Sequence, residues 1–449
     1  MKILVIGNGF DLAHELPTSY NDFLEFCRRV KIIFENVNLM NMQFEQSWLK
    51  DWKTDSYIKN CLKEAFEKRT CKGTLQEGGE YLYNVTVQDS VLTELYTYIK
   101  HNTWLEYFWN CPSYVGKNWI DFEAEISKVI QAIEAGRFKS ENEGSIMGTE
   151  RNESIILTAL MKAAKKTLQS AFGDVRAMMK FVDFLYSELE KLIRALEIYI
   201  AEFVSNIKIE KVSGDIMHLN PNHILSFNYS NTYERVYGEK KEIAYDYIHG
   251  KADICNTLET NDMVLGIDEY LKDDKKDSEI DFIAFKKYYQ RLYKQSKRLT
   301  EVWCAAIKKE AEYEKNSRKF MLEEQIGYEL VEEKSGLRYS WQDYEKLTKD
   351  YEEQYDSLHP KHEVYIFGHS LDVTDKDILR NLILNDNVHT TIFYCKKKDS
   401  SGNYDNGRKD RGEKIANLVK VIGQNELIKR TGGATKTIEF KLQQDMIIR

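Results

Sequence analysis

The stretch KILVIGNGFDLAHELPTSY, residues 2–20, indicates how the chain begins to fold. Its apolar opening ends at Gly7, and Gly9 follows two residues later, a pattern typical of a buried strand that runs into a tight turn. Thr18 and Ser19 then offer hydroxyl groups that can cap a helix. The stretch therefore predicts a strand, a glycine turn, a loop and a helix, in that order.

Strand and helix patterns alternate along the rest of the chain. Apolar runs typical of strands occur at 223–227, 242–248, 263–267, 363–368, 388–395 and 437–442. Between them lie long stretches with apolar residues at three-and-four spacing, and the chain has only 4 prolines, which favours long helices. Strands separated by helices indicate an α/β fold with a mostly parallel, Rossmann-like sheet covered on both faces.

The order of these patterns predicts one discontinuous domain that spans residues 1–449. Its Rossmann-like core comprises 1–30, 215–270 and 360–449, and two large α-helical insertions occupy 31–214 and 271–359. Sheets of this kind bind ligands at the carboxyl ends of their strands. The motifs below lie at predicted strand ends, so we expect them to meet at one crevice.

The composition excludes several classes of protein. Of the 449 residues, 42% are hydrophobic, which is enough for a sizeable core and too many for a disordered chain. The formal net charge of −8 offers nucleic acid no general attraction, and no apolar run approaches the roughly 20 residues of a membrane span. The 7 cysteines are scattered without a C-x-x-C pair, so we expect neither a zinc site nor a disulfide framework, and a reducing cytoplasm fits best.

The glycine turn is the first candidate site. Gly7 and Gly9 permit close approach of a ligand, and exposed N–H groups after a strand can cradle a phosphate. The segment only half matches the G-x-G-x-x-G fingerprint of dinucleotide sites. A glycine turn that serves the fold alone is the other interpretation.

Two segments of the middle region carry polar side chains at strand ends. In SFNYSNTYE (226–234), Asn228 can present its amide to a hydroxyl or a water, or else Asn228 or Ser230 caps the next helix. In YIHG (247–250), His249 has the side chain best suited to proton transfer near neutral pH, although a lone histidine is often structural.

The segment FGHSLDVTDKDIL (367–379) repeats the pattern of a strand that ends in glycine. Ser370 is a candidate for contact with the ribose or phosphates of a nucleotide, and Asp372 for contact with a hydroxyl. Alternatively, Thr374 or Asp375 caps the helix that follows. Both interpretations stay open at this point.

Acidic residues alternate with apolar ones in NWIDFEAEI, residues 118–126. Asp121, Glu123 and Glu125 could bind a metal or act as acid and base. The preferred interpretation is the start of an amphipathic helix with acids at its positive end, because no histidine lies nearby.

Taken together, these motifs resemble a known family. The opening LVIGNGFDLAHELPTSYNDFL, with NWIDFE, LSFNYSNTYE, IHG and IFGHSLDVTDKDI, is similar to the AbiH family of bacterial abortive-infection, phage-defence proteins. The similarity follows the order of the motifs along most of the chain. The GNGFDLAHELPTSY string is the most specific part.

The same motif order resembles sirtuin-like NAD-consuming domains, and the resemblance implies a sirtuin-like core with Asn228 and His249 as catalytic residues. It also implies a nucleotide site made of Gly7, Asn8, Gly9, Phe10, Asp11, Ser226, Tyr229, Gly250, Gly368, His369, Ser370 and Asp372. Asn8 stands where those domains usually carry Ala, and Ser230 where they carry Asp. The four-cysteine zinc module of sirtuin deacylases is missing from the sequence, so protein deacylation is not expected.

The resemblance implies an abortive-infection effector that hydrolyses NAD at the nicotinamide–ribose bond and needs no metal. Asn228 would position water or ribose, and His249 would act as general base. A phage-derived trigger and a homo-oligomer are expected, whereas membranes and nucleic acid are not expected as partners. The alternatives are a nucleotide-binding sensor without catalysis and a metal-dependent nuclease that uses Asp121, Glu123 and Glu125.

Overall fold

The structure is a computed structural model of the chain. It describes residues 1–35, 49, 51–70, 87–111, 114, 120–143, 151–165, 175–238, 242–267, 281–295, 298–332, 345–346, 349, 361–397, 404–432 and 436–449.

A six-stranded sheet forms the centre of the molecule, and every pair of neighbouring strands is parallel. Its strands follow the order β4-β3-β1-β5-β6-β7. Taken in chain order, this is the 3-2-1-4-5-6 arrangement of doubly wound dinucleotide-binding sheets. The predicted α/β fold with a mostly parallel, Rossmann-like sheet is therefore confirmed. The strands are β1 (Lys2–Ile6), β3 (His223–Ser226), β4 (Ala244–Tyr247), β5 (His362–Phe367), β6 (Val388–Tyr394) and β7 (Ile438–Leu442).

The two sequence runs that echo each other, KILVIG and EVYIFG, are the neighbouring central strands β1 and β5. Ile3 and Val5 belong to the apolar cluster on one face of the sheet, and Leu4 and Ile6 belong to the cluster on the other face. All four are buried, because helices cover both faces. The strand order reverses between β1 and β5, and this is where such sheets open a crevice for ligands.

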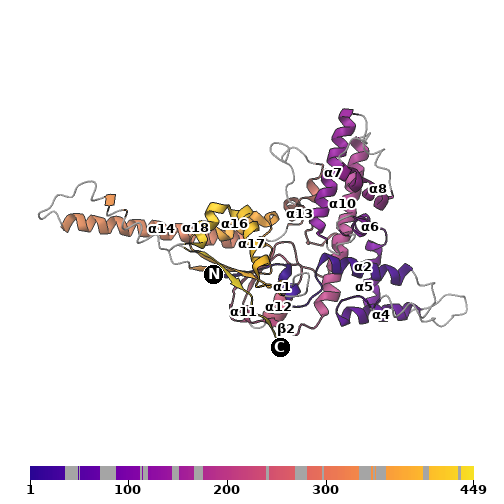
Figure 1. Ribbon diagram of the computed structural model, residues 1–449, viewed down its shortest axis with the longest axis horizontal. Coiled ribbons are helices and arrows are strands. Elements are labelled where there is room, and N and C mark those ends of the chain that lie inside the picture. Colours follow the sequence, from indigo (N-terminus) through magenta and orange to yellow (C-terminus); the bar gives the residue numbers. More distant parts are fainter. Residues whose placement is uncertain are drawn as a thin grey trace, which may run out of the picture.

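The first helical block stands beside the sheet and has a core of its own (Figure 1). Its longest helix, α10, packs against α5 and α6. No helix in the described part of the chain is both long enough and apolar enough to span a membrane. The block contains α2 (Tyr20–Glu35), α4 (Ser56–Thr70), α5 (Val87–Ile99), α6 (Thr103–Asn110), α7 (Phe122–Glu143), α8 (Arg151–Ala164) and α10 (Val175–Ile198), which continues into a short π-helix, Tyr199–Phe203.

The remaining helices surround the sheet or project from it. The 34-residue helix α14 (Leu299–Glu332) extends away from the body on the side opposite the first block (Figure 1). The others are shorter. They are α1 (Asn8–Ala13), α11 (Gly214–Met217), α12 (Thr232–Tyr237), α13 (Lys287–Tyr293), α16 (Lys376–Ile383), α17 (Arg408–Ile422) and α18 (Gln424–Thr431).

Local structure differs from the sequence-based expectation in three places. Helix α1 starts at Asn8, directly after β1, where a glycine turn and a loop were expected. The run 263–267 is not a strand; it makes only an isolated bridge at Ile267, and its apolar side chains fill the core of the helical block instead. A separate two-stranded antiparallel sheet, β2 (Lys211–Ser213) with β8 (Met446–Ile448), was not predicted, because three-residue strands carry little pattern. The division into core and insertions stays a prediction.

Candidate functional site

A cavity of about 860 Å³ opens at the carboxyl ends of β1, β3, β4 and β5. All five sequence motifs contribute to its wall, together with residues of both helical blocks. Its lining residues include Gly7, Asn8, Gly9, Asp11, Asp121, Glu123, Phe227, Asn228, Tyr229, Ser230, His249, Lys287, Gly368, His369, Ser370, Asp372 and Asp375. Segments that are far apart in the sequence therefore meet at the switch point of the sheet.

The glycine turns at the ends of β1 and β5 touch each other. The backbone N–H of Gly9 donates to the carbonyl oxygen of Gly368 at 2.8 Å. A Cβ atom on Gly9 would lie 2.8 Å from that oxygen, and one on Gly7 would lie 2.8 Å from the Cα of His369. Gly368 has a φ of +68°, which residues other than glycine rarely adopt. The close approach of the two loops is thus sufficient to explain these glycines.

Asn228 ties the end of β3 to the first glycine turn. Its side-chain amide donates to the carbonyl oxygen of Gly7 at 3.0 Å, and its backbone N–H donates to Ser226 Oγ at 3.1 Å. Helix α12 begins at Thr232 without a side-chain cap, so the capping interpretation of Asn228 and Ser230 is wrong. The buried Oδ1 of Asn228 accepts no hydrogen bond from any described residue.

Ser230 instead donates to a buried carboxylate, Asp11 Oδ2, at 2.6 Å. Asp11 is 1% exposed, and burial raises the pKa of this carboxyl to about 6, against the opposing effect of the hydrogen bond from Ser230. Its second oxygen, Oδ1, has no hydrogen-bond donor within the described part of the chain. Asp11 and Asn228 therefore each retain an acceptor oxygen beside the cavity.

Not every predicted binding residue reaches the cavity. Asn8 lies in the wall and accepts a hydrogen bond from Thr18 Oγ1 at 2.7 Å. Phe10 packs in the core against Tyr237 and Phe367. Phe10, Ser226 and Gly250 are not lining residues, whereas the other predicted residues are.

His249 faces the carboxylate of Asp375, a residue that the sequence suggested as a possible helix cap. The Nε2 atoms of His249 and His369 each lie 3.5 Å from an oxygen of Asp375. Asp375 occupies the N-cap position of α16 but its side chain makes no capping hydrogen bond, and Asp372 accepts the N–H of Thr374, so neither Thr374 nor Asp375 caps this helix with its side chain. Asp375 sits between the two imidazoles instead.

The hydrogen-bond partners define the tautomers of both histidines. Arg291 Nη2 lies 3.3 Å from His249 Nδ1, and the backbone N–H of Leu371 donates to His369 Nδ1 at 2.9 Å. Because guanidinium and amide N–H groups only donate, each Nδ1 accepts and each Nε2 carries the proton. Burial, and after it the charge of Lys287, lower the pKa of His249 to about 4, so the ring is uncharged at neutral pH.

Lys287, from α13, completes this cluster. Its Nζ lies 2.7 Å from Glu123 Oε2 and 3.8 Å from Asp375 Oδ1. Burial opposes the charge of Asp375, but Lys287 and the histidines hold the pKa of this carboxyl well below its usual range. Sequence reasoning missed Lys287, since one lysine in a lysine-rich helical stretch carries no distinguishing signal.

The three acids of the NWIDFEAEI motif point to three different places. Asp121 caps α7 by accepting the N–H of Ala124 at 3.2 Å, and Glu125 is buried beside Tyr107. Only Glu123 reaches Lys287, and burial raises the pKa of Glu123 to about 7. Within the described part of the chain, no group of three or more His, Cys, Asp or Glu side chains is arranged to hold a metal ion.

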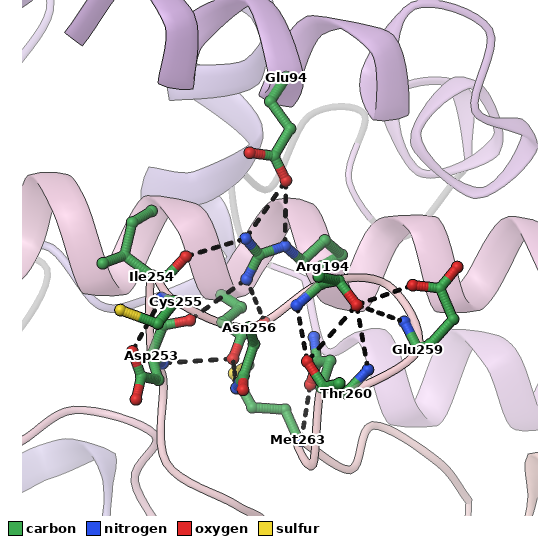
Figure 2. A network of polar contacts seen from close by, with 12 residues as sticks. Glu94, Arg194, Asp253, Ile254, Cys255, Asn256, Glu259, Thr260 and Met263 are labelled. Atoms are coloured by element: carbon green, nitrogen blue, oxygen red, sulfur yellow. Dashed lines mark hydrogen bonds and ion pairs between the residues drawn. The ribbon is translucent and has the colours of Figure 1, made fainter. Parts of the chain in front are cut away.

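A second buried charge network anchors the loop that follows His249 (Figure 2). Arg194 of α10 is 1% exposed and donates to Glu94, to Glu197 and to the carbonyl oxygens of Asp253 and Ile254. Beyond this loop, the N–H of Val264 donates to the carbonyl oxygen of His249 at 2.8 Å. The first helical block thereby holds the His249 turn in place.

The fold and the cavity define a Rossmann-like protein with a polar site at the switch point of its sheet. The family model described as bacteriophage abortive infection AbiH matches residues 3–395. The match covers most of the chain, and the protein belongs to the AbiH family. Comparisons with curated proteins and with solved structures gave no match.

Proposed function

We propose that the protein acts in abortive infection by hydrolysing NAD at the nicotinamide–ribose bond in this cavity. The observation that carries the proposal is the meeting of three distant segments at one site. Gly7–Gly9, the pair Asn228 and His249, and Gly368–Asp375 all line the cavity at the switch point of a 3-2-1-4-5-6 sheet. Membership of the AbiH family supports the link to phage defence.

In the proposed reaction the bond between the ribose carbon and the nicotinamide nitrogen breaks, and the nitrogen keeps the electron pair. Nicotinamide leaves as a neutral molecule, so no acid is needed to protonate it. A water oxygen bonds to the ribose carbon, which has oxocarbenium character in the transition state. The proton of that water passes to His249. Asn228 would use its unbonded Oδ1 to hold the water or a ribose hydroxyl.

The protonation state of His249 supports a role as base. A carboxylate that accepts the N–H of an imidazole orients the ring and leaves the other nitrogen to take a proton. Here Asp375 faces Nε2, so Nδ1 would be the basic nitrogen. The 3.3 Å contact of Nδ1 with Arg291 would give way to the substrate water.

A second candidate function is nucleotide sensing without catalysis. The specific observation in its favour is that both ring nitrogens of His249 already have protein partners, Arg291 and Asp375. A sensor would bind NAD or ADP-ribose and would still protect cells when His249 is replaced by Ala.

The test measures NAD in infected cells and in reactions of the purified full chain, with and without phage lysate. We expect wild type to consume NAD, and His249→Ala to reduce the rate by roughly 10²–10⁴-fold. His218→Ala serves as the control, because His218 is exposed and does not line the cavity. Growth arrest with unchanged NAD would contradict the proposal. A phage-derived trigger, a homo-oligomer and a cytoplasmic location remain predictions.

A further inference from the structure

Helix α13, within the predicted insertion 271–359, places two cations at the His249–Asp375 pair. Lys287 and Arg291 are one helical turn apart, so both side chains lie on the same side of the helix. Lys287 lies 3.8 Å from Asp375 Oδ1, and Arg291 lies 3.3 Å from His249 Nδ1. Two positive charges from α13 therefore flank the pair of His249 and Asp375.

We propose that Lys287 is a positioning residue of this site. Its ammonium group fixes Asp375 as the carboxylate that orients His249, and it links the helical insertions to the sheet. The inference rests on the proposed function only in so far as His249 is taken to be catalytic. The electrostatic effect on His249 holds for a sensing site as well.

Geometry separates Lys287 from the other buried lysines. It is 5% exposed, and it is the only Lys or Arg among the described residues that line the cavity. Lys414 is also buried, but it donates to the carbonyl oxygen of His369 at 2.7 Å and pairs with Asp410, away from the cavity. Lys287 instead bridges two carboxylates, Glu123 and Asp375, that belong to different parts of the fold.

Each element packed around His249 contributes an identifiable group. Asp375 faces its Nε2 from the loop before α16, and Arg291 faces its Nδ1 from α13. Tyr229 and Phe227, from the loop after β3, place their rings at 6.4 and 5.6 Å from the imidazole. His369 contacts the other oxygen of Asp375, and Glu123 pairs with Lys287. Asp375 and Glu123 are the negative charges of this set, and Lys287 and Arg291 are the positive ones.

The charge of Lys287 therefore determines at what pH this cluster takes up a proton. With Lys287 present, Asp375 stays ionised and a proton on His249 would lie near an ammonium group, which is unfavourable. Without Lys287, Asp375 loses the cation that holds its pKa down, and Glu123, whose pKa burial already raises to about 7, loses the cation that favours its charged form. The pair of Asp375 and His249 should then accept a proton at higher pH.

The experiment is a pH titration of the full-length protein labelled with [¹⁵N]histidine, with the His249 signals assigned by their loss in His249→Ala. In wild type we expect the uncharged form with the proton on Nε2 from about pH 8 down to about pH 5. In Lys287→Met we expect protonation to move upward by about one unit or more. Lys287→Arg keeps the charge and should titrate as wild type does.

Two further variants keep the test decisive. Lys294→Met removes the lysine that follows α13 and donates to the carbonyl oxygen of Met263, outside the cavity wall, and should leave the His249 titration unchanged. Lys287→Gln removes the charge but keeps a side chain that can donate a hydrogen bond to Glu123, and should move protonation upward as Lys287→Met does. Identical titration of wild type and Lys287→Met would overturn the proposal. If Lys287→Met fails to fold, identical titration of wild type and Lys287→Gln would overturn it.

An activity readout separates this inference from the proposed function. If wild type hydrolyses NAD, Lys287→Met should lower kcat at least tenfold with little change in KM, and the pH profile should shift with the titration. If wild type leaves NAD intact, the proposed function fails, and the histidine titration still decides the role of Lys287.

Discussion

The buried charge network around Arg194 and the one around Asp375 in the cavity differ in how many of their polar atoms make hydrogen bonds. All five N–H groups of Arg194 have acceptors, at 2.7–3.3 Å. In the cavity, by contrast, Asp375 Oδ1 makes no hydrogen bond of normal length with a described residue, because His249 Nε2 and Lys287 Nζ lie 3.5 and 3.8 Å from it. Asp11 and Asn228 add further oxygens without donors.

The difference indicates what each network does. A fully bonded buried network fixes one arrangement of the chain, whereas buried acceptors without donors cost free energy unless something else satisfies them. The Arg194 network holds the loop after His249 against the helices. The cavity cluster retains acceptors for the hydroxyl, amide or water hydrogens of a ligand. Substitutions in the two networks should therefore have different consequences.

The largest effect on stability is expected for Arg194→Met. The change leaves Glu197, which is 0% exposed, without its cation, and it frees the carbonyl oxygens of Asp253 and Ile254. Removing one partner of a buried ion pair typically costs about 3–5 kcal/mol. The free energy of unfolding, measured with urea at pH 7, should fall by that amount.

An exposed ion pair provides the matched control for Arg194. Lys208 and Glu210 are 3.1 Å apart with side chains that are 86% and 64% exposed. Lys208→Met should cost less than about 1 kcal/mol. A loss of similar size in Arg194→Met would mean that the five hydrogen bonds contribute little, and the contrast between the two networks would disappear.

The next largest effect is expected for Asp11→Asn, which should raise the free energy of unfolding at pH 7. Burial raises the pKa of Asp11 from 3.8 to about 6, so the folded protein binds a proton that the unfolded chain has already released. This group's contribution to stability is present below about pH 4 and is lost as the pH rises through 6. At pH 7 the ionised carboxylate therefore destabilises the fold by roughly 2–3 kcal/mol.

Asn removes that charge and can still accept the hydrogen bond from Ser230. We expect Asp11→Asn to unfold at higher denaturant concentration than wild type at pH 7 and to match it near pH 4. The measurement is the difference between the two stability curves from pH 4 to 8. A difference that stays constant over this range would show that Asp11 does not titrate as its burial implies.

The sheet was the part of the fold that sequence patterns predicted best. After the charged residues Lys2 and Glu363, the runs KILVIG and EVYIFG are apolar or aromatic up to their glycines, because both faces of a central parallel strand are buried. The short strands β2 and β8 and the helix α1 were missed, since three to six residues carry too little periodicity. The run 263–267 was misassigned because burial in a helical core and burial in a sheet demand the same apolar residues.

The candidate site was predictable where residues follow strands of the sheet. Asn228 and His249 lie two residues after the ends of β3 and β4, and Gly368 directly follows β5, so the topology of a parallel sheet brings them together. Asp375 and Lys287 were not predicted as partners of His249. Asp375 fits a helix cap equally well by sequence, and Lys287 reaches the site only through the packing of α13.

The smallest stability effect is expected for Asp375→Asn, and it sharpens the contrast with Arg194. The amide has the size of the carboxylate, its oxygen can still accept an N–H from one histidine, and Lys287 keeps Glu123 at 2.7 Å as its partner. We expect a change of about 1 kcal/mol in the free energy of unfolding at pH 7. NAD hydrolysis, if the proposed function is right, should fall far more than stability, because His249 loses the charge that orients it. A loss of stability as large as that of Arg194→Met would instead make the cavity cluster a second structural anchor, and the distinction between the two networks would no longer hold.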